Sequence, residues 1–485
     1  MGALMAAIAT GVCLALSAIC EADAKETFRL GVCCHPSYVR LMPTDWDEVF
    51  KWTKGCGADL CRIDWDADWE LNDRILTAAA AAGVELLPIL FPPAPQQDTE
   101  QAWYATARAY AQECGRRYRD KIRYYELSNE REARCMTQWP NGGDRDGAAI
   151  TDYDPDKYAP IRGMLRGLAE GLRETDLDCR RIIDTGGWLH FGFIDMLVRD
   201  EVPFDILAWH WYSEMGEMNR VIKSYSGEYQ LLDKLASYGK PVWITEGNMR
   251  HGTMAGDEKA QQEYLTKTIG SLAKTGKIGA YVAYELFDEP SLLSHGGEAF
   301  YGIVHCEFGL NEGREFAGAR GTVRVREEFV GRKALVLGWD FTKGGAYVTV
   351  NWLPRKQVTA DVLRLAVRGP AGSVPFVIRV VDSTGQHLQL TPDIELTGQW
   401  QEVCVPFEGP WDDTWAGDDD GTLHQPIRGV WIGVGASGPK TGEVGIARLE
   451  LLDKEYPRYT YDLVDHNVFQ AKPAWAGLWG ALGDR

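Results

Sequence analysis

The chain has 485 residues, of which 45% are hydrophobic and 25% charged, with 52 glycines and 22 prolines. This composition is that of a globular protein with ample apolar material for a core, and it excludes a disordered, collagen-like or coiled-coil chain. Acidic residues outnumber basic ones by 70 to 51, giving a formal net charge of -19. That charge argues against nucleic acid or an anionic membrane as partner, and it disfavours a strongly anionic substrate.

The chain begins with a run of small and apolar residues from Ala3 to Cys20. The Ala22-Asp23-Ala24 sequence that follows matches the A-x-A pattern of a signal-peptidase site. We therefore expect residues 1–24 to be a signal peptide and the protein to be secreted or periplasmic, without membrane contact after cleavage. The alternative is an uncleaved membrane anchor, because no Lys or Arg precedes the apolar run.

From residue 25 to 320, short β-rich segments alternate with amphipathic helical segments, as in repeated βα units around a parallel sheet. Eight strands are predicted, at residues 28–35, 58–65, 84–91, 122–129, 181–188, 204–212, 241–246 and 278–287. Helices are predicted between them, among others at residues 45–54, 101–118, 158–173 and 259–274. The eight strands fit a (β/α)8 TIM barrel, which takes about 250 residues. A dinucleotide-binding open sheet is disfavoured because no Gly-rich loop follows the first strand.

A change of pattern at residue 321 predicts a second domain. From 321 to 455, alternating strands with turn residues replace helical periodicity, which predicts a β-sandwich of jelly-roll type. This segment resembles jelly-roll carbohydrate-binding modules, with Gly344–Val348 early and Gly442–Ile446 near its last strand. Residues 456–485 return to helix, which we interpret as the eighth helix of the barrel, with the sandwich inserted before it. We interpret the acidic run 411–420 as a solvated turn, with a Ca²⁺-binding loop as the alternative.

Nine cysteines follow the leader, an odd number that cannot pair completely. Cys56 and Cys61 are the local candidate for a disulfide after export. The nine include no C-x-x-C pair and no Cys/His cluster with zinc spacing, so we expect no structural metal.

Two glutamates end predicted strands. Glu130 follows strand four in the sequence Tyr-Tyr-Glu-Leu-Ser-Asn-Glu, and Glu246 ends strand seven in Val-Trp-Ile-Thr-Glu. The C-terminal ends of barrel strands meet at one face, so we expect the two carboxylates to face each other across the barrel mouth. Glycoside hydrolysis needs such a pair, one acid to protonate the departing oxygen and one base or nucleophile at the anomeric carbon.

With these motifs the barrel resembles the retaining glycoside hydrolases of clan A, most closely families 39 and 5. The Asn-Glu pair that the clan carries after strand four corresponds to Asn129-Glu130, and its strand-seven glutamate to Glu246. The resemblance extends to residues 61–65, 210–212 and 284–288. It implies hydrolysis of O-glycosidic bonds in an oligosaccharide or polysaccharide by double displacement, with no cofactor and no metal.

The resemblance also implies a role for each residue. Glu130 is the general acid and then the base, with a pKa that Glu246 raises until its charge is consumed. Glu246 is the nucleophile, and Asn129 binds the sugar 2-OH or the nucleophile. The residues expected to orient Glu246 or keep it charged are His210, Tyr212 and Arg62. The aromatic residues expected to contact sugar are Trp65, Trp139, Trp188, Trp211 and Tyr284, the last in place of the tryptophan that floors the site in many clan members.

Each assignment has a structural alternative. A strand-end glutamate is often a solvated charge, His210 is alternatively a core histidine, and Arg62 alternatively pairs with Asp64 or Asp66. Glu132 is the alternative acid. Two other functions stay open: a catalytically silent carbohydrate-binding or structural protein on the same scaffold, and a metal-dependent TIM-barrel hydrolase. The latter is disfavoured because strand one offers only His35 and no H-x-H pair. The oligomeric state, the sugar and the linkage are left open.

Overall fold

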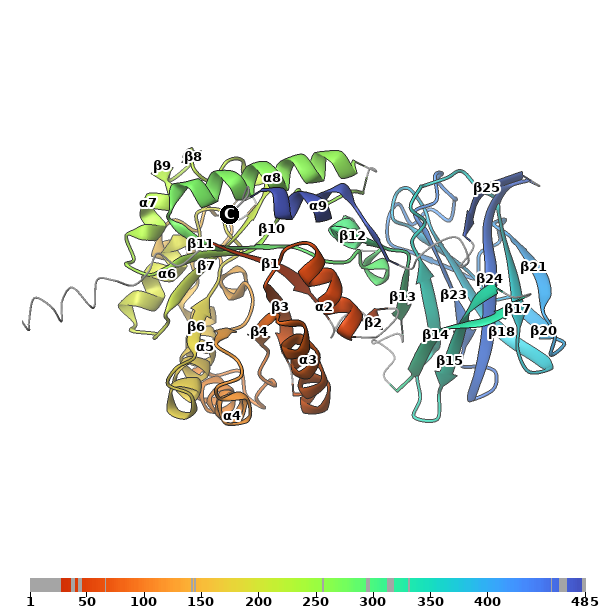
Figure 1. Cartoon of the computed structure of the whole chain (residues 1–485), viewed down its shortest axis with the longest axis horizontal. Helices are drawn as coiled ribbons and strands as arrows, with labels where there is room; N and C mark the ends of the chain where they lie inside the picture. Colours follow the sequence, from red (N-terminus) through yellow and green to blue (C-terminus); the bar gives the residue numbers. More distant parts are fainter. Residues whose placement is uncertain are drawn as a thin grey trace, which may run out of the picture.

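The computed structural model describes residues 28–35, 40–41, 46–65, 67–140, 143, 145–254, 257–293, 297–311, 318–329, 332–454, 456–461 and 469–481. The predicted signal peptide lies outside these residues. Two domains lie side by side, a barrel on the left of Figure 1 and a β-sandwich on its right.

Eight parallel strands close the barrel, in the order β1-β11-β10-β7-β6-β5-β4-β3. They are β1 (Arg29–Cys34), β3 (Leu60–Trp65), β4 (Glu85–Leu90), β5 (Tyr124–Glu126), β6 (Arg180–Ile183), β7 (Ile206–Tyr212), β10 (Val242–Asn248) and β11 (Ile278–Ala283). Each overlaps one of the eight predicted segments, although β6 begins one residue earlier and β10 ends two residues later than predicted, and the TIM-barrel prediction is confirmed. The strands are buried on both faces, as the near-continuous apolar runs indicate.

Helices cover the outside of the barrel. They are α2 (Trp46–Gly55), α3 (Trp69–Ala82), α4 (Glu100–Tyr118), α5 (Pro155–Thr175), α6 (Phe191–Arg199), α7 (Leu231–Ala236) and α8 (Glu258–Thr275). Polar side chains begin several of them, since Asp68, Thr99, Asp154 and Asp257 accept backbone N–H groups of the first turn. Gly83 ends α3 in the left-handed conformation, at φ 65°, where glycine carries no steric cost.

The last helix of the chain completes this layer. Helix α9 (Pro473–Gly480) lies along α8 in Figure 1. On its other side Trp475 meets Trp52 of α2, with ring centroids 5.5 Å apart, and its indole N–H donates to the Trp52 carbonyl. Helix α9 therefore occupies the position of the eighth barrel helix, and the chain builds the sandwich between β11 and this helix.

The sandwich consists of two antiparallel sheets. The first has the order β2 (Arg40–Leu41), β13 (Phe308–Asn311), β16 (Tyr347–Trp352), β23 (Gly429–Gly435), β18 (Gly372–Val381), β19 (His387–Leu390) and β22 (Asp413–Trp415), with β20 (Asp393–Leu396) beside β18. The second has β14 (Arg320–Phe329), β15 (Arg332–Asp340), β24 (Thr441–Asp453), β17 (Val362–Arg368) and β21 (Gln401–Pro406), with β25 (Tyr456–Tyr461) beside β24. The first sheet thus includes strands that precede residue 321.

The outer face of the first sheet packs against loops of the barrel. Tyr347, Val377 and Trp431 form an apolar cluster with Leu293 and Phe300, which belong to the segment after β11. The strands β12 (Val304–Cys306) and β26 (Phe469–Ala471) pair at the same place and carry the chain out of the barrel and back. The two domains therefore share a continuous interface.

Two further predictions concern the cysteines and the acidic run 411–420. All cysteines from Cys33 to Cys404 are free thiols, so the candidate disulfide between Cys56 and Cys61 is not formed. In the acidic run 411–420, Asp412 and Asp420 accept hydrogen bonds from the backbone of Thr391 and Thr422. Asp420 thus stabilises a local turn, whereas Asp412 joins two segments that are 21 residues apart, and the solvated turn stays a prediction.

Within the part of the chain that the structure covers, no helix combines the length and the apolar character needed to cross a membrane.

Candidate active site

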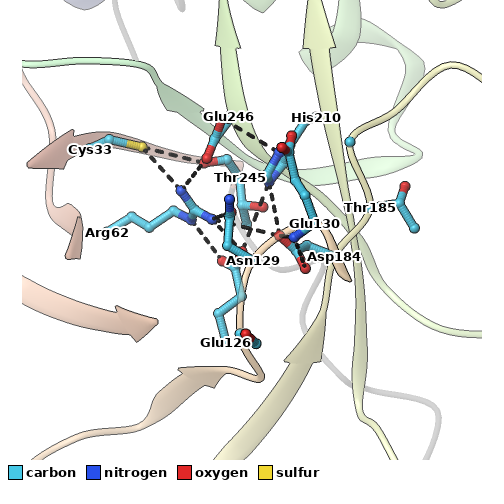
Figure 2. Close-up of polar contacts among 12 residues, drawn as sticks. Cys33, Arg62, Glu126, Asn129, Glu130, Asp184, Thr185, His210, Thr245 and Glu246 are labelled. Carbon is cyan, nitrogen blue, oxygen red and sulfur yellow. Dashed lines mark hydrogen bonds and ion pairs between the residues drawn. The ribbon is translucent and has the colours of Figure 1, made fainter. Parts of the chain in front are cut away.

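The two predicted glutamates meet at the C-terminal end of the barrel. Glu246 lies on β10, and Glu130 follows β5 in the left-handed conformation at φ 45°, with its N–H directed at Asp184, 3.2 and 3.3 Å from the two carboxylate oxygens. One carboxylate oxygen of each glutamate and one ring nitrogen of His210 all lie within 4.8 Å of one another. Figure 2 shows the three side chains converging. Their accessibility differs, because the Glu130 side chain is 38% exposed and that of Glu246 only 8%.

Two donors fix the carboxylate of Glu246. Arg62 Nη1 donates to Oε1 over 2.6 Å, and the Tyr212 hydroxyl donates to Oε2 over 2.9 Å. Arg62 lies on β3, across the barrel interior, and Tyr212 lies on β7, the strand paired with β10. Both oxygens of Glu246 are therefore held in one orientation by hydrogen-bond donors.

Arg62 is fully buried and contacts more than one acid. Its Nε and Nη2 atoms donate to the two oxygens of Glu126, over 2.9 and 2.6 Å, and Nη2 also donates to Asn129 Oδ1 over 2.6 Å. Burial raises the pKa of Glu126, but the charges and hydrogen bonds of Arg62 and His210 together outweigh burial and hold that pKa at about 2. The alternative partner Asp64 lies against His35 instead, and Asp66 is outside the described residues.

His210 lies between the acids with no exposed surface. Its Nδ1 is 2.7 Å from Glu130 Oε1 and 3.4 Å from Glu246 Oε2, and its Nε2 is 3.3 Å from Asp184 Oδ2. Burial alone would lower the pKa of His210, but the surrounding carboxylates, Glu246 above all, raise it well above the usual value. It is therefore not a neutral histidine of an apolar core.

The prediction that Glu246 raises the pKa of Glu130 is wrong. Burial raises the pKa of Glu130, but the hydrogen bond and the charge of His210, with smaller contributions from Arg62 and His190, lower it by more. The net pKa of Glu130 lies below its usual value. The cause is the imidazole placed between the two glutamates, which the sequence alone does not reveal.

Asp184 and Glu126 belong to this cluster although neither was predicted as a site residue. Burial, with the charge of Glu126, raises the pKa of Asp184 well above its usual value. Asp184 stands directly after β6, at Ile-Ile-Asp, so the strand-end rule that identified Glu130 and Glu246 also applies to it. Cys33 joins the cluster too, with its sulfur 3.8 Å from Arg62 Nη1. We call Arg62, Glu126, Glu130, Asp184, His210 and Glu246 the mouth cluster.

Residues 185–298 match the family model described as "Glycosyl hydrolase catalytic core". This chain is a glycoside hydrolase. The matched segment contains β7, β10 and β11, and with them His210, Tyr212 and Glu246.

Solved structures similar to this glycoside hydrolase include a β-glucosidase from Thermotoga maritima, 12% identical, with a TM-score of 0.43 over 58% of this chain and 93% of the other. A GH10 endoxylanase from a sugarcane soil metagenome is 14% identical, with a TM-score of 0.41 over 54% and 86% of the two chains. A sequence search of the curated proteins finds no match. The assignment to family 39 or 5 remains a prediction.

Glu132 is excluded as the acid of the hydrolase by its burial. Its side chain has no exposed surface, and its Oε1 accepts the Gly186 N–H over 2.5 Å and lies 2.8 Å from His190 Nδ1. It holds the loop after β6 in place. A side chain on Gly186 would begin 3.2 Å from Glu130 Oε1, so this loop lies directly against the exposed glutamate.

Two of the predicted sugar-stacking rings are core residues. Trp65 and Trp211 have no exposed surface. Trp65 packs edge-on against Tyr118 of α4, and the Trp211 indole donates to the Gly216 carbonyl over 2.8 Å. The reason is strand alternation: Arg62 and His210 point into the barrel mouth, so residues an odd number of positions away point outward to the helices.

Tyr284, by contrast, is partly exposed beside Glu246. Its ring centroid lies 6.3 Å from that of Tyr212 and 5.4 Å from that of Tyr301. Tyr284 is therefore placed where a ring at the end of the last strand can support a sugar.

The segments that follow β5, β6 and β7 carry Trp139, Trp188 and Tyr225, which we call the aromatic rim. Tyr225 is 89% exposed at the tip of the hairpin β8 (Val221–Ser224) and β9 (Gly227–Gln230), and its ring centroid lies 6.1 Å from that of Trp139, itself 38% exposed. Ser226 donates twice to Asp146, which also interacts with the partly exposed Trp188. Tyr225 was not predicted as a site residue, because the hairpin of β8 and β9 is too short to be recognised from the sequence.

Two groups of side chains in the described part of the chain have ligand atoms close enough to hold a metal ion. They are Glu126, Asp184 and His210, and Glu130, His210 and Glu246. Arg62 donates to a carboxylate of each group. A guanidinium therefore already supplies positive charge to both groups, and a divalent cation there would repel it.

Proposed function

We propose that the enzyme hydrolyses O-glycosidic bonds of an oligosaccharide or polysaccharide with retention of configuration, with Glu246 as nucleophile and Glu130 as general acid and base. The distance between the two carboxylates carries this proposal. Their nearest oxygens lie within 4.8 Å. Retaining enzymes hold the two carboxyl groups about 5–5.5 Å apart, whereas inverting enzymes need about 6.5–9.5 Å to admit a water molecule.

In the first step an oxygen of Glu246 attacks the anomeric carbon while Glu130 transfers a proton to the departing glycosidic oxygen. The C–O bond to the leaving group breaks, and a glycosyl ester of Glu246 forms. In the second step Glu130 takes a proton from water, which attacks the same carbon and releases Glu246. The difference in exposure fits these roles, since Glu130 must meet the leaving group and water, whereas Glu246 meets only the sugar.

Neighbouring side chains position the sugar. Asn129 accepts from Arg62 through Oδ1, which leaves its amide N–H groups to donate to the sugar 2-OH, a contact that strengthens in the oxocarbenium-like transition state. Arg62 and Tyr212 keep the nucleophile oriented. Tyr284 supplies an apolar ring below the sugar.

The aromatic rim supports a chain of sugars as substrate. The acid protonates the leaving-group oxygen, so the leaving group lies on the Glu130 side, and Trp139 is carried by the same segment after β5 that carries Glu130. Rings of this kind stack against the apolar faces of sugars. The predicted signal peptide, residues 1–24, supports action outside the cytoplasm, where polysaccharides are found.

The variants Glu246→Gln and Glu130→Gln test the proposal, assayed on a panel of polysaccharides and aryl glycosides. Glu246→Gln is expected to lose at least about 10⁴-fold in kcat on every substrate. Glu130→Gln is expected to lose about 10²–10⁴-fold on substrates with poor leaving groups, and much less on 2,4-dinitrophenyl glycosides, whose first step needs no acid. Glu214→Gln, an exposed glutamate after β7, serves as the matched control and is expected to match the wild type.

Time-resolved NMR of the first product should show the anomer of the substrate. The proposal fails if that product has the opposite configuration or if either catalytic variant retains wild-type activity. Activity is expected to survive EDTA, and its loss would favour the metal-dependent alternative. Binding without turnover across the whole panel would favour a catalytically silent protein.

A further inference from the structure

His210 makes more contacts with acids than its predicted role of orienting Glu246 requires. Both ring nitrogens face carboxyl oxygens, Nδ1 those of Glu130 and Glu246, and Nε2 that of Asp184 at 3.3 Å and that of Glu126 at 3.9 Å. The ring is fully buried, so water does not compete for these contacts. As carboxylates, Glu130 and Glu246 accept and do not donate, which favours a proton on Nδ1.

The charges of the mouth cluster point the same way. The acids that face His210 are Glu126, Glu130, Asp184 and Glu246. The cation Arg62 pairs with three of these acids. Burial and the charge of Glu126 raise the pKa of Asp184, which disfavours its charged form. The three remaining carboxylates exceed Arg62 in charge, and a protonated His210 reduces that excess.

We propose that Glu130 and His210 act as one acid–base dyad in the hydrolysis proposed above, with the mobile proton on His210 in the free enzyme. The contact of 2.7 Å between His210 Nδ1 and Glu130 Oε1 is the path of the proton. His210 does not reach the sugar, because it has no exposed surface. It is therefore a positioning residue that holds the proton for Glu130.

The proton balance of the dyad follows both steps. In the first step the proton moves from Nδ1 to Glu130 and on to the departing oxygen, while Glu246 becomes a neutral ester. The dyad is then a neutral imidazole beside a carboxylate. Among the carboxylates, the charge of Glu246 contributes most to the raised pKa of His210. Formation of the ester removes this charge, and the neutral imidazole is then favoured. In the second step Glu130 takes a proton from water, the Glu246 carboxylate returns, and the proton comes to rest on His210 again.

This device differs from direct repulsion between the two glutamates. Repulsion would keep the proton on Glu130, whereas the imidazolium lowers the pKa of Glu130 and stores the proton next to it. Asp184 supports the pair from behind, since the Glu130 N–H points at its carboxyl group and its Oδ2 faces Nε2. The charge of Glu246 thus sets the proton affinity of the dyad through His210.

The pH dependence of kcat/KM tests the dyad. In the wild type the alkaline fall occurs as the dyad loses its proton, hence at the raised pKa of His210. His210→Asn keeps a donor toward Glu130 but carries no proton to give, so the fall should move to lower pH by at least about one unit. Tyr212→Phe, which removes the other donor to Glu246 but no mobile proton, is expected to lower activity without moving the fall. An unmoved alkaline fall in His210→Asn overturns the proposal.

A ¹⁵N-histidine NMR titration of the folded protein needs no substrate and no change at His210. We expect both ring nitrogens of His210 to be protonated at pH 7 in the wild type. In Glu246→Gln, which mimics the neutral ester, His210 should lose its proton at lower pH. A neutral His210 at pH 7 in the wild type, or the same titration in both proteins, overturns the proposal. The proposed function fails separately, through the activity of Glu246→Gln and the anomer of the product.

Discussion

Among the described residues, two of the buried ionic clusters look alike in composition but differ in balance. In the mouth cluster four acids, Glu126, Glu130, Asp184 and Glu246, face the two bases Arg62 and His210. A second cluster lies between the barrel and the sandwich and consists of Asp288, His305, Glu307, Arg355 and Lys472. Here two acids face three bases, and we call it the junction cluster.

In the junction cluster, every carboxylate oxygen of the two acids has a partner. Lys472 Nζ donates to Asp288 Oδ1 over 2.6 Å, and His305 Nδ1 lies 2.8 Å from the other oxygen of Asp288. Glu307 accepts from Trp352 and Tyr459 of the sandwich, over 3.1 and 2.9 Å. The partners of these acids come from the barrel, the sandwich and the segment before α9, so the junction cluster joins the domains.

The mouth cluster keeps an excess of acid and opens to solvent at Glu130, whose side chain is 38% exposed. Here Arg62 contacts both Glu126 and Glu246, and His210 contacts both Glu130 and Glu246. The comparison shows that burial of charge does not mark a catalytic site. What marks it is an imbalance that makes protons mobile, together with access for a ligand.

Arg62→Met should have the largest effect, because it removes the cation that the mouth cluster shares. The nucleophile loses an oriented donor, and we expect kcat/KM to fall by about 10²–10³-fold or more. Glu126 also loses its bidentate partner while fully buried, which should cost about 3–5 kcal/mol in the free energy of unfolding. Kinetics on an aryl glycoside and urea unfolding measure the two effects. Wild-type kcat/KM would contradict the assignment of Arg62 to the site.

Lys472→Met is the matched change in the junction cluster. It removes the cation of Asp288, and we expect a loss of about 3–5 kcal/mol in the free energy of unfolding, because the pair is buried. The activity per folded molecule should stay within about twofold of the wild type, since Lys472 contacts Asp288 and Thr253 and not the catalytic glutamates. A tenfold loss of kcat/KM at wild-type stability would show that the two clusters are coupled.

Removal of the aromatic rim should have the smallest effect and only on long substrates. We expect Trp139→Ala and Tyr225→Ala each to reduce kcat/KM on a polysaccharide by about 2–10-fold, from about 0.5–1.5 kcal/mol of ring contact. A monosaccharide aryl glycoside should be unaffected, because it does not reach the rim. Leu177→Ala, an apolar residue 76% exposed between α5 and β6, is the control. Equal losses of kcat/KM on the polysaccharide and the aryl glycoside would show that the aromatic rim does not bind the substrate chain.

The barrel and its two glutamates could be predicted from the sequence, because the patterns that indicate them lie within short segments. Each strand is a short apolar run, and a glutamate at its C-terminal end must lie at the catalytic face once the strands are parallel. The same rule would have found Asp184. Strand alternation would also have removed Trp65 and Trp211, since Arg62 and Asp64, or His210 and Tyr212, require the neighbouring side chains to point outward.

Sequence by itself thus determined the eight strands, the change to a sandwich and the pair Glu130 and Glu246, because apolar period and strand ends are properties of short segments. Only the tertiary structure decided the lowered pKa of Glu130, the free thiols of Cys56 and Cys61, and the sharing of Arg62 among several acids. These depend on distances between side chains that are far apart in the chain. Barrel closure sets those distances, and electrostatic interaction falls steeply with separation and rises with burial.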